Sequence, residues 1–350
     1  MIELAHHPGL GRSVRTGSLE QLAEGTYPRL MRAIAEGRSV EAAELSDFFV
    51  VEARVCFDIY TQWTRDALRY LVHHGLDEAE LTVALSRING LVLSGRPEGL
   101  AEREHTFARI ESLAKTAGQG DAQAARSLWD LWRHLHDADV DRLTGLFDIV
   151  VRRFGEAAIG DMYENWLIGE WFEKRYVRFD ISRQPWEEAF DLLVYLTFES
   201  MHGHLAGPGR EGSITFEELE DRIVFTFDPC GSGGRLVRGE PKDSTPPRDE
   251  PPYGFAVLQE AHNFTGGKKG ICTYCAHCCI LTEKLPIERF GYPVRVVDPP
   301  LAPDGRNNPC RWTIYRTPEA VPEAIYHRVG ARKPGPGEPL GSASRQRISS

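Results

Sequence analysis

Six of the seven cysteines lie between residues 230 and 310. Four of them fall in the segment ICTYCAHCCI at 271–280, together with His277, and Cys230 and Cys310 stand on either side of it. Deprotonated sulfur and neutral imidazole at close spacing are what a soft metal ion requires. Neither Cys230 nor the 272–279 segment completes a tetrahedral ligand set alone. The pattern therefore predicts a fold in which these segments meet around a thiol cluster.

Composition excludes several classes of protein. The chain has 350 residues, 41% of them hydrophobic, which suffices for a large core or two domains. A formal net charge of -10 argues against a nucleic-acid-binding protein. No window resembles a membrane span and the first residues do not resemble a secretory signal, so we expect a cytoplasmic protein without a membrane partner. In a reducing compartment, clustered cysteines indicate ligands or reactive thiols.

The periodicity of apolar residues changes from helical to extended near residue 207. A helix beginning at Ser39 and helical segments around 121–137 and 139–155 are expected, and alternation over 214–227 predicts a hairpin. The predicted fold class is α+β, a helical N-terminal region packed on a C-terminal antiparallel sheet that carries a cysteine-rich metal site. The expected segments are a mobile leader at 1–17, a helical region at 18–206, an α+β region at 207–330 with a proline-rich insertion at 239–252, and a disordered tail at 331–350.

The spacing of the cysteines suggests a metal site. Two residues between thiolates allow both sulfurs to bind one zinc ion. Cys230, Cys272, Cys275 and Cys278 make a plausible closed set, so zinc is the first cofactor hypothesis. The overlapping run is also similar to part of a ferredoxin motif, which leaves an iron–sulfur cluster as the alternative, beside a metal-free thiol cluster.

Donors beyond that set suggest catalysis. Cys279 could act as a nucleophile, and His277 or His202 could carry protons. Glu199 and His202 have the i, i+3 spacing of helical carboxylate–histidine sites, and we expect both, with His204, to line the same cavity as the thiols. The first functional hypothesis is a zinc-dependent hydrolase or lyase acting on a small organic substrate. The alternatives are a metal- or redox-responsive sensor that binds a small molecule without turnover, and an iron–sulfur protein.

The order of elements in the second half carries a resemblance. A hairpin, a cysteine segment, the strand GYPVRVVDPP with Asp298, and the strand NPCRWTIYRT with Cys310 near its start follow a helical front half. This order resembles the small-molecule-binding α/β modules of the vinyl-reductase type and the related aminothiazoline-carboxylate hydrolase family. The resemblance implies a buried small-molecule pocket beside the cysteines.

Overall fold

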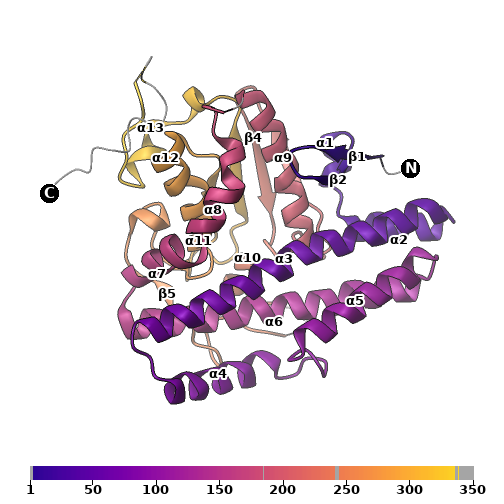
Figure 1. Cartoon of the computed structure of the whole chain (residues 1–350), viewed down its shortest axis with the longest axis horizontal. Coiled ribbons are helices and arrows are strands. Elements are labelled where there is room, and N and C mark those ends of the chain that lie inside the picture. The colour runs from indigo at the N-terminus through magenta and orange to yellow at the C-terminus, as the bar shows by residue number, and fades with distance from the viewer. Residues whose placement is uncertain (1–2, 184, 241–243, 336–337, 339–350) are drawn as a thin grey trace.

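The predicted α+β class is confirmed by a computed structural model, which describes residues 3–183, 185–240, 244–335 and 338 (Figure 1). Long helices form one layer, and an antiparallel sheet lies in the C-terminal half of the chain. Within the described residues, no helix has both the length and the apolar character needed to cross a bilayer.

The helical layer consists mainly of α3 (Ser39–His73), α5 (Arg103–Gly118) and α6 (Ala122–Phe154). Helix α3 buries an apolar stripe at helical spacing, as the sequence predicts. The two segments expected around 121–137 and 139–155 are one continuous helix, α6, whose middle is buried on nearly every side. The other helices of this half are α1 (Leu19–Ala23), α2 (Thr26–Ala35), α4 (Glu78–Leu93), α7 (Ala157–Met162), η1 (Tyr163–Leu167), α8 (Gly169–Arg175) and η2 (Tyr176–Phe179).

The main sheet has four antiparallel strands in the order β3-β4-β8-β7. The hairpin predicted over 214–227 is present, and Phe225 of its second strand packs on Phe198 of α9 with ring centroids 5.1 Å apart. These elements are α9 (Trp186–Gly203), β3 (Thr215–Glu218), β4 (Arg222–Phe227), β7 (Val296–Asp298) and β8 (Cys310–Tyr315).

Short elements complete the C-terminal half and carry the cysteines. Helix α11 holds four residues of the cysteine segment, among them Cys278 and Cys279. The short elements are α10 (Gly233–Arg238), β5 (Val257–Leu258), η4 (Asn263–Thr265), β6 (Ile271–Cys272), α11 (Ala276–Cys279), η5 (Ile280–Lys284), α12 (Leu285–Phe290), η6 (Pro318–Ala320) and α13 (Glu323–His327).

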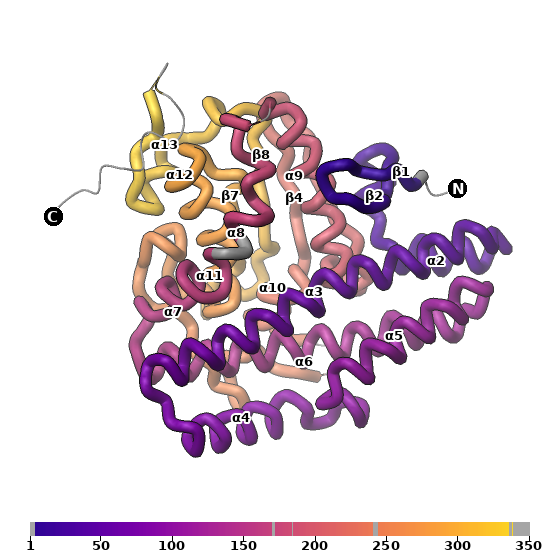
Figure 2. The backbone as a smooth tube through the Cα atoms, viewed as in Figure 1, coloured from indigo at the N-terminus to yellow at the C-terminus, as the bar shows by residue number. Residues whose placement is uncertain are grey.

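The segment expected as a mobile leader at 1–17 forms a hairpin instead, from β1 (Glu3–His7) and β2 (Arg12–Thr16). It lies beside α9 (Figure 2), where Arg12 donates to both oxygens of Glu199. Arg15 is buried. Two arginines that gain buried partners explain why this polar segment folds onto the body of the protein.

The proline-rich insertion at 239–252 is anchored to α6 through a buried arginine. Arg248 is buried and donates from Nε and Nη2 to the two carboxylate oxygens of Asp141, each at 3.0 Å. Residues 241–243 lie outside the described residues, as does most of the tail predicted to be disordered at 331–350.

A buried charge network joins this segment to α6. Asp141 also accepts from Arg235, which lies on α10, at 2.5 Å and from Arg96 at 2.7 Å. Burial alone would raise the pKa of Asp141, but the charges of these arginines and Arg248 outweigh it and hold the pKa below its ordinary value. One turn earlier, Asp137 accepts two hydrogen bonds from Arg210, both at 2.7 Å.

We expect Asp141→Asn to lower the free energy of unfolding by about 3 kcal/mol, because it leaves buried arginines without their countercharge. Chemical denaturation of wild type and variant measures the difference. Asp130→Asn is the matched control on the same helix, since the Asp130 side chain is 51% exposed and pairs with Arg133 at the surface. It should cost less than about 1 kcal/mol. Equal losses in the two variants would contradict the structural role of the network.

Candidate functional site

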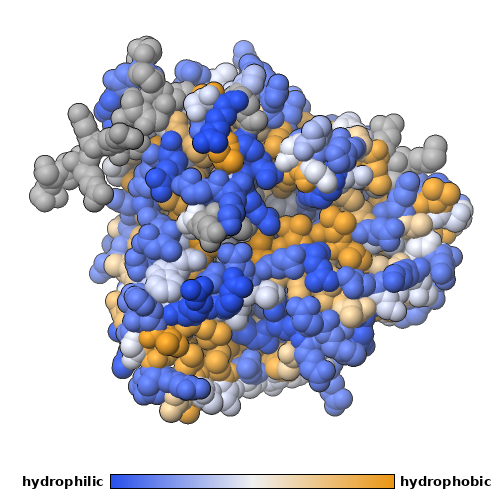
Figure 3. Space-filling view, viewed as in Figure 1, coloured by the Kyte–Doolittle hydropathy of each residue, from blue (hydrophilic) through white to orange (hydrophobic). Residues whose placement is uncertain are grey.

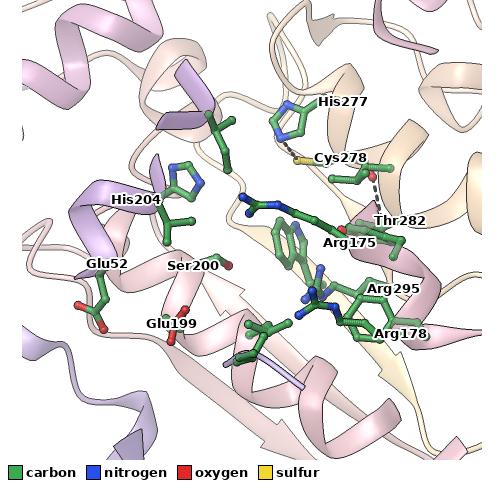
Figure 4. Close-up of a pocket in the computed structure, with 18 of the residues that line it drawn as sticks. Glu52, Arg175, Arg178, Glu199, Ser200, His204, His277, Cys278, Thr282 and Arg295 are labelled. Carbon is green, nitrogen blue, oxygen red and sulfur yellow. Dashed lines mark hydrogen bonds between the residues drawn. The ribbon is translucent and has the colours of Figure 1, made fainter. Parts of the chain in front are cut away.

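A cavity of about 420 Å³ lies between α3, α9, the α8–η2 segment and the residues around α11. Figure 4 shows charged and polar side chains from these elements converging on it. Hydrophobic residues gather over the middle of α3 on the same face of the molecule (Figure 3). The site therefore combines apolar walls with charged groups, which is typical of a pocket for a small organic ligand.

Four arginines line this pocket. Arg12 comes from β2, Arg175 from the end of α8, Arg178 from η2, and Arg295 from the residue before β7. In Figure 4 the guanidinium groups of Arg175, Arg178 and Arg295 extend into the space between the two sides of the pocket. Segments far apart in the chain thus bring several positive charges to one cavity.

Arg295 is buried without a countercharge. Its side chain donates to Thr197 Oγ1 at 2.8 Å and to the Leu193 carbonyl at 3.3 Å, and its guanidinium lies 5.2 Å from the Trp312 ring centroid. The residue is only 6% exposed, and no carboxylate of the described chain lies within ion-pair distance of it. Burial lowers the pKa of Arg295, which reflects the cost of holding this charge away from water.

Arg178 is in a similar position at the pocket's edge. It forms no ion pair with any described residue, and it is half-buried. Burial and then the neighbouring charges of Arg175 and Arg12 lower the pKa of Arg178. Like charges held this close repel one another, so an anion in the pocket would relieve a cost that the protein alone leaves unbalanced.

The two acidic groups of the pocket are already bound by other side chains. Glu199 accepts from Arg12 and from the Tyr195 hydroxyl. Glu52 lies 2.9 Å from His202 Nδ1 and 2.9 Å from Thr26 Oγ1. Their negative charge is thus directed toward these partners, and the arginines on the other side of the pocket keep their positive potential.

Glu199, His202 and His204 are expected to line one cavity with the thiols, and only two of them do. Glu199 and His204 line the same pocket as Cys278, as the sequence predicts. His202 is not among the described residues that line either this pocket or the thiol cavity; its ring is buried and hydrogen-bonded to Glu52. His204 Nδ1 lies 2.8 Å from the Tyr60 hydroxyl, and burial lowers the pKa of His204 well below its ordinary value. The proton-carrying role of His202 stays a prediction.

His277 and Cys278 form a hydrogen-bonded pair at one end of the pocket (Figure 4). His277 Nδ1 lies 2.5 Å from the Tyr274 carbonyl oxygen and must donate to it, since a carbonyl only accepts. His277 Nε2, 3.3 Å from Cys278 Sγ, is then the acceptor of the thiol proton in the neutral ring. Trp63 and Tyr274 pack on the imidazole with ring centroids 4.9 and 4.7 Å away. Burial lowers the pKa of His277 to about 4.

A second cavity, about 30 Å³, is lined by Cys230, Cys275, Cys278 and Cys310. The sheet brings Cys230 and Cys310 together. Phe227 pairs with Cys310, so Cys230, three residues further on, lies at the same end of the sheet. Gly233 brings Cys275 close, because a Cβ on Gly233 would lie 2.3 Å from the Cys275 sulfur. The predicted meeting of Cys230 with the 272–279 segment is therefore seen.

The two remaining cysteines of the cluster face elsewhere. Cys272 lies 2.8 Å from Cys275, sulfur to sulfur, but lines neither the pocket nor the thiol cavity. Cys279, the predicted nucleophile, is fully buried and lines neither of these two cavities of the described chain. Burial and then Glu283 raise the pKa of Cys279 to about 12. Its catalytic role stays a prediction.

The zinc-dependent hydrolase or lyase predicted from the sequence is wrong. No group of three or more histidine, cysteine, aspartate or glutamate side chains in the described parts of the chain is arranged to hold a metal ion. Of the four predicted ligands, Cys272 lines neither the pocket nor the thiol cavity of the described chain, so the set does not face one common space. Neither this function nor its sensor and iron–sulfur alternatives is carried further, and the choice of zinc or a cluster as cofactor stays a prediction.

The arginines are the site residues that the sequence reasoning missed. Arg295 offered a signal, a charged residue inside the apolar run Tyr292–Val297. Arg175 and Arg178 stand three apart in EKRYVRF, as neighbours on one helical turn do. No spacing rule connects these residues to Arg12, because only the tertiary fold brings them together.

Comparison with protein-family models, with curated proteins and with solved structures gave no match. The resemblance to the vinyl-reductase type and the aminothiazoline-carboxylate hydrolase family stays a prediction.

We expect His277 to remain neutral, with its proton on Nδ1, throughout the range from about pH 5 to pH 8. The reason is the lowered pKa of about 4 and the donation to the Tyr274 carbonyl. ¹⁵N chemical shifts of the histidine rings report both tautomer and charge. The unfolded chain binds this proton near pH 6.5, so burial of neutral His277 costs stability as the pH falls from there toward 4. A ring that titrates near 6.5 in the folded protein would contradict the buried, neutral state.

Proposed function

We propose that the protein binds a small organic anion, with a carboxylate or phosphate head group, in the arginine-lined pocket. The cavity of about 420 Å³ falls in the range of pockets that bury most of a small ligand. A small-molecule ligand is also the partner expected from the sequence. We further propose a cytoplasmic location, which cell fractionation would test.

The observation that carries the proposal is the buried, unpaired charge of Arg295. A guanidinium placed away from water is costly unless an opposite charge compensates it. Thr197 and the Leu193 carbonyl satisfy part of its hydrogen-bonding capacity but supply no countercharge. With Arg178 beside the same pocket and also without a carboxylate partner among the described residues, the bound ligand is the natural source of the missing negative charge.

The rest of the pocket suggests an apolar body for this anion. Aliphatic and aromatic side chains surround the arginines, among them Ile59, Trp63, Phe179, Leu281 and Trp312. A fully hydrophilic anion would leave these walls uncovered, whereas an aromatic or branched aliphatic body would bury them. The proposed ligand is therefore amphipathic, with one anionic end.

We expect Arg295→Met to weaken the binding of an aryl carboxylate by about 10- to 100-fold, the worth of one charge-assisted hydrogen-bonding partner. Isothermal titration calorimetry with a set of aryl carboxylates, aryl phosphates and their uncharged amides measures this, and the amides should bind weakly. Arg178→Met should give a smaller loss, since Arg178 is less buried.

Arg311→Met is the matched control, because Arg311 is exposed on β8 and does not line the pocket in the described chain. It should leave affinity unchanged. Equal binding of carboxylates and amides, or an Arg295→Met protein that binds anions as well as wild type, would contradict the proposed function.

A further inference from the structure

One cysteine differs from the others in its surroundings. All seven cysteines lie in the described residues, and five of them are buried. Of the two that are partly accessible, Cys278 lines the large pocket and Cys230 lines only the small thiol cavity. A ligand in the pocket can therefore reach the sulfur of Cys278 and no other.

The imidazole beside this thiol is oriented to take its proton. His277 Nδ1 donates to the Tyr274 carbonyl, which leaves the lone pair of Nε2 directed to Cys278 Sγ at 3.3 Å. The aromatic rings of Trp63 and Tyr274 hold the imidazole in place. Burial raises the pKa of Cys278 well above its ordinary value, so the resting site holds a thiol beside a neutral imidazole. The geometry therefore places His277 Nε2 to accept the thiol proton as the sulfur attacks, which is how an adjacent base assists a cysteine nucleophile.

The same pocket would hold an anion close to this thiol. Arg295 lies near enough to Cys278 for the two to interact electrostatically, and both face the cavity in Figure 4. An anion bound to Arg295 through its head group would place neighbouring carbon atoms beside the sulfur. Binding would then also hold the reacting atoms in orientation, which is how a site speeds a reaction with a bound group.

We propose that Cys278 is a nucleophile, with His277 as its base, that attacks an electrophilic carbon in a small carboxylate held by the arginines. This inference rests on the proposed function. In the step, Cys278 Sγ forms a bond to the carbon, and the bond from that carbon to a leaving group breaks with its electron pair. The thiol proton passes to His277 Nε2. No oxidant or reductant is required, and the product is a thioether or thioester on Cys278.

Iodoacetate and iodoacetamide test the proposal, because the two reagents differ only in the carboxylate and release iodide in the same step. We expect mass spectrometry of peptides from briefly treated wild-type protein to show alkylation at Cys278 ahead of the other cysteines. The ratio of the iodoacetate rate to the iodoacetamide rate should exceed the ratio for a free thiol by about tenfold or more, as electrostatic attraction provides. The iodoacetate reaction should also saturate with concentration.

Two variants separate the roles. His277→Gln should slow alkylation of Cys278 by about 10²-fold, the usual worth of a general base. Cys278→Ser should abolish this labelling. Cys56→Ser is the matched control, since Cys56 is buried in the helical layer and lines neither cavity of the described chain, and it should leave the labelling as it is.

The failures of the two proposals differ. If Cys278 resists both reagents while aryl carboxylates bind normally, the nucleophile is overturned and the anion pocket stands. If Cys278 reacts rapidly with both reagents at the free-thiol ratio, the nucleophile stands and the anion pocket fails. Alkylation of wild type needs no variant, so a variant that does not fold leaves the decisive comparison intact.

Discussion

Two buried carboxylates on α6 determine how the halves of this protein fit together. Asp137 and Asp141 stand one turn apart and accept hydrogen bonds from Arg210, Arg235 and Arg248, all on the C-terminal side of the chain. Because a buried charge is tolerated only when an opposite charge meets it, this match specifies which surface of the helical layer the second half covers. The pocket, the thiol cavity and the proline-rich segment all take their positions from that contact.

The requirement that a buried charge meets an opposite charge also applies to the pocket. The arginines that meet α6 are balanced by carboxylates, whereas Arg178 and Arg295 face the cavity and have none within the described chain. An anionic ligand would neutralise the arginines of the pocket as Asp137 and Asp141 neutralise those that meet α6. Its binding would therefore stabilise the folded protein.

Local patterns in the sequence predicted the helices, the 214–227 hairpin and the meeting of Cys230 with the cysteine segment, since each depends on periodicity or on chemistry within reach. Local patterns did not predict which side chains face the pocket. Cys278 and Cys279 are adjacent, yet one faces the pocket and the other the core, and a rotation of about 100° along a helix decides which. The segments expected around 121–137 and 139–155 are one helix, and the buried arginine partners of its central carboxylates lie far along the chain, where local patterns do not reach.

A crystal structure of the protein soaked with a bromine-labelled aryl carboxylate would show whether the arginine-lined pocket binds an anion. Anomalous scattering locates the bromine without reference to any assumed pose. We predict one site inside the large pocket, with the carboxylate within hydrogen-bonding distance of Arg295 or Arg178 and the bromine among the apolar walls near Trp63 and Trp312. A ligand bound elsewhere, or one whose carboxylate points away from both arginines, would contradict the account.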